Sequence, residues 1–248
     1  MSKKTEIASG VITLAVGSLI LNPIGAAVFD KVMHPILADF MERLLSTNQK
    51  SRIEKVLEDA IYKIASRLEK NDIPSSNEEF WTEDSNRVSD AKVVLEGILL
   101  KARDEYEEKK LPYYSNLIAQ MAFDPSWSYQ RLNAMIRMFE QLSYRQLQLM
   151  ALAMQKEGID TSQWDVKFKR TPNSFAYYDL FCEVVNLSNL ALFHQPELSI
   201  TLGLGNKLAL SPIGKSMAEL MELSTIPQDE LKDLDYMITT LNHDILKL

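Results

Sequence analysis

The chain has 248 residues and a formal net charge of −7, and 46% of its residues are hydrophobic. That hydrophobic fraction is typical of a folded protein and excludes wholesale disorder, while the acidic balance argues against a protein that coats nucleic acid by charge alone. The single cysteine excludes a disulfide framework and a cysteine-rich metal site, and it suits a reducing cytosol.

Residues 7–29 are uncharged, and they carry the strongest local signal in the chain. As one helix they would be about 35 Å long, against a bilayer core of about 30 Å. Asn22 and Pro23 should end or kink that helix near Leu21. Small residues recur along one side, which would let a second helix approach closely. The predicted membrane-contact or helix-packing residues are Ser9, Gly10, Thr13, Leu14, Gly17 and Leu21.

Three interpretations of this N-terminal segment, residues 1–46, stay open. A secretory signal peptide would account for Lys3 and Lys4, but the apolar pattern continues past the small residues that would be cleaved. The second interpretation is a helical hairpin buried in a soluble protein. The third is a helix that inserts into, or lies against, the inner membrane. For the last two we expect a cytoplasmic protein with at most a peripheral or single-segment membrane attachment.

Residues 47–125 predict an amphipathic helical domain. The expected elements are helices over residues 49–70, 89–110 and 111–123, with a polar loop over 71–90. In the first helix, Ile53, Leu57 and Ile61 share one face, which should be buried. The second helix ends in a run of charges from Asp104 to Lys110, which we interpret as a solvated surface.

Residues 126–248 predict helices interrupted by a short β-hairpin. We expect helices over 127–141, 143–158 and 174–194, strands over 198–202 and 207–210, and further helices starting at Ser211 and Pro227. The last helix has an acidic surface. The order of these elements is typical of a winged-helix-like module over about 129–223. The predicted fold class is therefore all-α (mainly helical), with one small β-hairpin in a winged-helix-like C-terminal module.

No residue pattern in the sequence points to catalysis. His34, His194 and His243 lie far apart without a ligand at helical spacing, and we expect His194 to close a helix. Cys182 lies in an apolar run and is predicted to be buried. The glycine-containing segment 203–207 is interpreted as a hairpin turn rather than a phosphate-binding loop. We therefore expect no catalytic residues, no metal site, no cofactor and no enzymatic activity.

A short basic segment is the main argument for nucleic-acid binding. The candidate contacts are Trp164, Lys167, Lys169 and Arg170. However, the helix predicted over 174–194 would be the recognition helix of a winged-helix module, and it contains no lysine or arginine. Protein contact or dimerisation is the better prediction for this module.

Several stretches between residues 50 and 155 resemble the bacterial Abi-alpha proteins, a helical family linked to abortive infection and phage defence. The matching stretches are Arg52-Ile53-Glu54, Ile73-Pro74, Leu111-Pro112-Tyr113-Tyr114-Ser115-Asn116-Leu117-Ile118-Ala119, Phe123-Asp124-Pro125 and Phe139-Glu140-Gln141-Leu142-Ser143. The resemblance implies a bacterial cytoplasmic or membrane-proximal protein that acts in defence by interaction rather than by turnover. It supplies no catalytic residues.

These observations lead to one expectation about function and two alternatives. We expect a non-enzymatic bacterial protein that associates with a membrane or binds a protein partner, including itself, in phage defence. The first alternative is a soluble homodimeric interaction protein whose N-terminal hairpin is buried in the core. The second is a winged-helix DNA-binding regulator.

Overall fold

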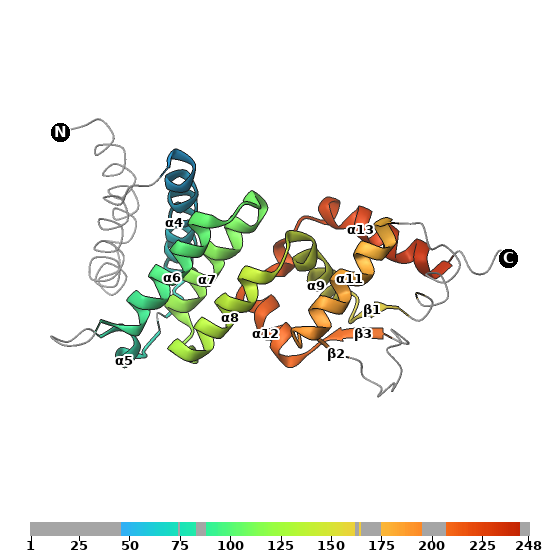
Figure 1. Cartoon of the computed structure of the whole chain (residues 1–248). Coiled ribbons are helices and arrows are strands. Elements are labelled where there is room, and N and C mark those ends of the chain that lie inside the picture. The colour runs from blue at the N-terminus through green and yellow to red at the C-terminus, as the bar shows by residue number, and fades with distance from the viewer. Residues whose placement is uncertain are drawn as a thin grey trace. The chain divides into compact units, whose positions relative to one another are not determined.

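The computed structural model of this chain describes residues 46–73, 75–82, 88–161, 164, 175–194 and 207–243. These residues are mainly helical and include a small antiparallel sheet, which confirms the predicted mainly-α fold class. The chain divides into two compact units, Met1–Gln141 and Leu142–Leu248. Figure 1 shows the helices and strands of both units.

The described part of the first unit is a helical bundle. Its elements are α4 (Thr47–Glu69), α5 (Glu78–Trp81), α6 (Asp90–Asp104), the 3-10 helix η2 (Glu108–Lys110), α7 (Leu111–Phe123) and α8 (Tyr129–Gln141). Helix α4 packs against α6 and α7, and α8 packs against α6. Ile53, Leu57 and Ile61 of α4 are buried in this core, as their helical spacing predicts.

Local side-chain chemistry sets where α4 begins and ends. At its start, the Ser46 hydroxyl accepts from the Gln49 N–H and the Gln49 side chain accepts from the Ser46 N–H, which is a capping box. At its end, Asn71 adopts a left-handed conformation with φ 64°, and the Asp72 N–H donates back to the Arg67 carbonyl. This Schellman geometry satisfies carbonyls that the helix leaves free.

Helix α6 ends at Asp104, six residues before the predicted end at Lys110. The next residue, Glu105, is extended, with φ −68° and ψ 125°, and this turns the chain out of the helical path. Lys110 then lies in η2 rather than in α6. The chain changes direction here because the Glu105 side chain is buried against residues that follow it, among them Lys110.

The second unit combines helices with a small sheet. Its described elements are α9 (Tyr144–Gln155), β1 (Ile159–Asp160), α11 (Phe175–Asn189), β2 (Phe193–His194), β3 (Lys207–Leu210), α12 (Pro212–Leu220), the 3-10 helix η3 (Leu223–Thr225) and α13 (Gln228–His243). Helix α9 contacts α11, α12, α13 and β3, and its Leu147 and Met150 are fully buried. It is therefore the central helix of this unit.

The three strands form an antiparallel sheet with β3 in the middle. The strand order is β1-β3-β2, with Ile159 opposite Leu208 and Phe193 opposite Leu210. The predicted strand over 207–210 is confirmed, whereas the predicted strand over 198–202 lies outside the described residues. The winged-helix assignment stays a prediction.

Helix α11 ends at Asn189, so the predicted helix to residue 194 is too long at that end. Ala191 takes the left-handed conformation with φ 57°, and the Leu192 N–H donates to the Leu187 carbonyl. This Schellman motif ends the helix without a glycine. His194 consequently lies in β2 and does not close a helix, which corrects the prediction made for it.

A close contact joins the start of α12 to the end of the α11 turn. The Ser211 N–H donates to the Leu192 carbonyl over 2.9 Å, and the Ser211 hydroxyl accepts from the Gly214 N–H over 3.0 Å. A Cβ atom on Gly214 would lie 2.1 Å from the Leu192 carbonyl oxygen. Only glycine can occupy this position without movement of the backbone.

The division between the two units also differs from the predicted domain boundary. The prediction separated residues 47–125 from 126–248 and so assigned α8 to the C-terminal module. In the structure α8 belongs to the first unit. The ring of Phe139 on α8 packs edge-on against Tyr114 with 4.6 Å between centroids, and this aromatic contact helps to hold α8 in the helical bundle.

Candidate interaction surface

Helix α11 carries a buried stripe that anchors it in the second unit. Leu180, Val184 and Leu187 follow one another at intervals of four and three residues, so they lie on the same helical face. All three side chains are fully buried. Because α11 contacts α9 and β2, this stripe fixes the rotation of the helix about its own axis.

The opposite side of α11 presents a second stripe to the outside. We call it the outward stripe and define it as Phe175, Tyr178, Cys182, Val185 and Asn189. Phe175 is 85% exposed and Tyr178 is 60% exposed, Cys182 and Asn189 are exposed, and Val185 is partly exposed. Two large aromatic side chains are therefore exposed to water on a helix whose opposite face packs against the core of the unit.

The outward stripe corrects the prediction made for Cys182, whose side chain is exposed rather than buried. An apolar run in a sequence suggests burial on all sides. A helix, however, places Cys182 about 160° away from Leu180 and Val184, since each residue advances by about 100°. Once those two residues face the core, Cys182 must face outward.

Neutral side chains dominate the surface around this stripe. Helix α11 contains no lysine or arginine. Glu183, which helical spacing places nearer to the buried stripe, is paired with Arg145 of α9 over 3.3 Å, and Asp179 is exposed. Because DNA phosphates are bound by cationic side chains, this face of α11 lacks the groups that a DNA-recognition helix requires.

The structure describes only one of the four candidate nucleic-acid contacts. Trp164 is fully buried, so it offers no exposed ring face on which a base could stack, and this corrects the expectation for that residue. Lys167, Lys169 and Arg170 lie outside the described residues. The predicted membrane-contact or helix-packing residues, Ser9, Gly10, Thr13, Leu14, Gly17 and Leu21, also lie outside them.

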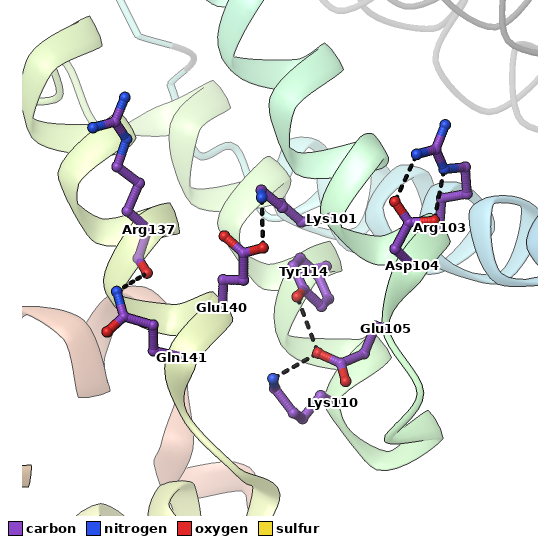
Figure 2. Close-up of polar contacts among 9 residues, drawn as sticks. All are labelled: Lys101, Arg103, Asp104, Glu105, Lys110, Tyr114, Arg137, Glu140 and Gln141. Atoms are coloured by element: carbon purple, nitrogen blue, oxygen red, sulfur yellow. Dashed lines mark hydrogen bonds and ion pairs between the residues drawn. The ribbon is translucent and has the colours of Figure 1, made fainter. Parts of the chain in front are cut away.

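A buried polar cluster in the first unit was not anticipated from the sequence. Figure 2 shows Glu105, Lys110 and Tyr114 converging where α6, η2 and α7 meet. The Lys110 Nζ atom lies 2.6 Å from the Glu105 Oε2 atom, and the Tyr114 hydroxyl donates to the same oxygen over 3.1 Å. The Glu107 N–H donates to the other carboxylate oxygen over 3.0 Å. The interpretation of this charged run as solvated surface is wrong for Glu105 and Lys110.

Burial governs the chemistry of this cluster. The side chain of Lys110 is 2% exposed and that of Glu105 is 5% exposed. Burial, followed by the nearby Glu105 carboxylate, raises the pKa of Tyr114 far above that of a free phenol, so its hydroxyl stays protonated and donates. The Lys110 ammonium also lies 5.1 Å from the ring centroid of Phe139. The cluster thereby ties α6, η2, α7 and α8 together.

An open pocket of about 470 Å³ lies between α4 and the start of α7. It is lined by Lys55, Asp59, Lys63, Glu108, Lys109, Leu111, Pro112 and Ser115. Lys55 and Arg52 each contact Glu108 over 3.0 Å, and their hydrogen bonds lower the pKa of that carboxyl. Lys63 pairs with Asp59. Arg52 and Lys55 thus pair with Glu108 across the α4–η2 contact, whereas Lys63 and Asp59 pair within α4.

The described residues contain no group of three histidine, cysteine or acidic side chains that could hold a metal ion. His194 is exposed in β2, His243 is the last residue of α13, and His34 lies outside the described part of the chain. Among the helices that the structure describes, none has the length and hydropathy needed to span a membrane. The uncharged run over 7–29 lies outside that search.

Comparison of the chain with protein-family models, with curated proteins and with solved structures gave no match.

Proposed function

We propose that this chain is a non-enzymatic partner-binding protein of bacterial phage defence, and that the outward stripe of α11 is its binding surface. The observation that carries the proposal is the exposure of Phe175 and Tyr178 beside one another on a rigidly anchored helix. Aromatic side chains are enriched among the residues that contribute most to protein–protein binding, because they bury a large area with few rotatable bonds. The resemblance to Abi-alpha proteins supports a role in defence by interaction.

The charges around the stripe favour a protein partner over a nucleic acid. A partner that covers the stripe would remove neutral side chains from water and would leave no unpaired cation behind. Asp179 lies at the margin, where it stays solvated. The depletion of charge at the centre with polar groups at the rim is the usual composition of a protein interface.

A phage-challenge assay tests this proposal. Bacteria that produce the full chain should lower the plating efficiency of at least one phage, and the double variant Phe175→Asp/Tyr178→Asp should abolish the protection. The matched control is Tyr236→Asp, because Tyr236 is a 73% exposed tyrosine on α13 of the same unit. If the double variant protected as well as the original chain, the outward stripe would not be the binding surface. If the original chain had no effect on any phage, a role in phage defence would be ruled out.

Membrane association through residues 7–29 is a second candidate function, favoured by the absence of charge over that run. In a flotation assay, the full chain should rise with vesicles that contain anionic bacterial lipids. Leu14→Lys places a charge at the middle of the predicted helix, which starts at residue 7 and ends near Leu21. It should keep the protein at the bottom of the gradient, since a central lysine costs about 3 kcal/mol on insertion scales. Leu14→Ile is the control. Flotation of Leu14→Lys would refute this candidate.

A further inference from the structure

We infer that the partner of the outward stripe is a second copy of this chain, paired antiparallel along α11 about a two-fold axis near Cys182. This inference rests on the proposed function of the stripe and names its partner. The sequence intervals between Phe175, Tyr178, Cys182, Val185 and Asn189 are three, four, three and four residues. That alternation is the spacing of a seam between two packed helices.

The seam can form while the fold of each copy stays intact. The core stripe of Leu180, Val184 and Leu187 is buried on the other side of the helix and remains in contact with its own unit. Each α11 would then pack on two faces, with one face inward and one against its counterpart. No rearrangement of the described residues is needed, because the stripe is already exposed.

The neutrality of the stripe makes it compatible with its own copy. A homodimer with two-fold symmetry uses the same patch twice, so a charged patch would meet its own charge. None of the five stripe residues is charged. Asn189 is the last residue of α11, so its side-chain amide lies at the end of the seam, where it can keep its hydrogen bonds to water.

The peptide dipoles of α11 favour one direction of the pairing. In a parallel pair, the partial positive charges at the two Phe175 ends would lie together, and so would the partial negative charges at the two Asn189 ends. In an antiparallel pair centred on Cys182, the positive end of each helix lies beside the negative end of the other, so the dipoles attract. The two exposed Asp179 carboxylates are then six residues apart along the seam, or about 9 Å, which exceeds the screening length of about 8 Å at physiological salt.

The short seam implies a weak dimer. Fifteen residues of α11 are about 22 Å long, so the buried area falls below the roughly 1,200–2,000 Å² of a stable standard interface. We therefore expect a concentration-dependent dimer with a Kd of roughly micromolar order or weaker. The stripe itself provides a reporter, because Cys182 is the only cysteine in the chain and would lie beside the partner's Cys182.

The experiment uses the purified full chain. Sedimentation velocity over a range of concentrations should show a shift from monomer to dimer. Copper–phenanthroline removes two electrons and two protons from two thiols, and it should convert the dimer to a disulfide-linked species of twice 28.3 kDa. Such a bond requires the two Cα atoms to approach within about 7 Å. Phe175→Asp should abolish both signals, whereas the control Tyr236→Asp should keep both, with circular dichroism showing that each variant is folded.

A relocated cysteine tests the direction of the pair. In the double variant Cys182→Ser/Asn189→Cys, a parallel pair would bring the two new cysteines together, but an antiparallel pair would hold them apart. We expect a non-covalent dimer without cross-linking. Cross-linking of this variant would overturn the antiparallel arrangement. A chain that stays monomeric and uncross-linked at every concentration would overturn self-pairing, and loss of phage protection in Phe175→Asp/Tyr178→Asp would then assign the stripe to a different protein partner.

Discussion

The buried ion pair between Glu105 and Lys110 predicts a large and strongly non-additive effect on stability. Glu105→Gln leaves the Lys110 ammonium in a site where its side chain is only 2% exposed, and Lys110→Met leaves the carboxylate at 5% exposure. Removing one partner of a buried pair costs about 3–5 kcal/mol of unfolding free energy, because the remaining charge stays desolvated without its counterion.

The double variant Glu105→Gln/Lys110→Met should be much less destabilised than the sum of the two single variants. Neither charge remains to be desolvated, and the glutamine oxygen can still accept from the Glu107 N–H while the glutamine NH2 group donates to the oxygen of the Tyr114 hydroxyl. We therefore expect a coupling energy of several kcal/mol in a double-mutant cycle. A methionine at position 110 retains most of the volume of the lysine chain, so the packing against Phe139 should persist.

Urea unfolding followed by circular dichroism measures these changes, and hydrogen exchange of α7 assigns them to the first unit. The matched control is Lys101→Met, which breaks the exposed ion pair with Glu140 in the same bundle, shown in Figure 2. Those two side chains are 39% and 44% exposed, so this variant should cost less than about 1 kcal/mol. Single variants at Glu105 and Lys110 that cost no more than this control would refute the reasoning.

Two further predictions concern a close backbone contact and a surface carboxylate. Gly214→Ala should lower the free energy of unfolding by about 1–3 kcal/mol, since the added Cβ would lie 2.1 Å from the Leu192 carbonyl oxygen. Thermal unfolding of the variant measures this loss. Gly97→Ala in α6 is the control, with no atom within 4 Å of the added Cβ, and it should stabilise by up to about 1 kcal/mol. An equal effect of the two substitutions would contradict the contact. For Glu108, the folded pKa lies below its ordinary value of 4.5 because of hydrogen bonds from its two basic partners on α4. Its contribution to stability is thus present above pH 4.5 and lost as the pH falls through the lower folded pKa. Glu108→Gln should flatten the pH dependence of the urea midpoint in that range, and a profile identical to that of the original chain would refute the assignment.

The sequence by itself determined most of the helical framework, because helices are specified by signals within a few residues. The buried positions of α4 follow from their spacing, and the start of α9 follows from the capping box of Ser143 and Gln146. Strand β3 was predictable from a short apolar run that precedes Ser211, the N-cap of α12. The lack of cationic residues on α11 was also readable, and it already favoured protein contact over DNA.

Only the tertiary structure decided which side of each element is buried and how the elements are grouped. Cys182 and Leu180 occupy similar apolar surroundings in the sequence, yet one is exposed and the other is fully buried. Glu105 and Lys110 belong to a charged run that is typical of a surface, but they are buried against each other, and Lys110 lies over the Phe139 ring of α8. The physical reason is that burial depends on contacts between distant segments, whereas periodicity and caps report only on near neighbours along the chain. The outward stripe could therefore be identified only once the structure showed that the opposite face of α11, with Leu180, Val184 and Leu187, is buried in the core.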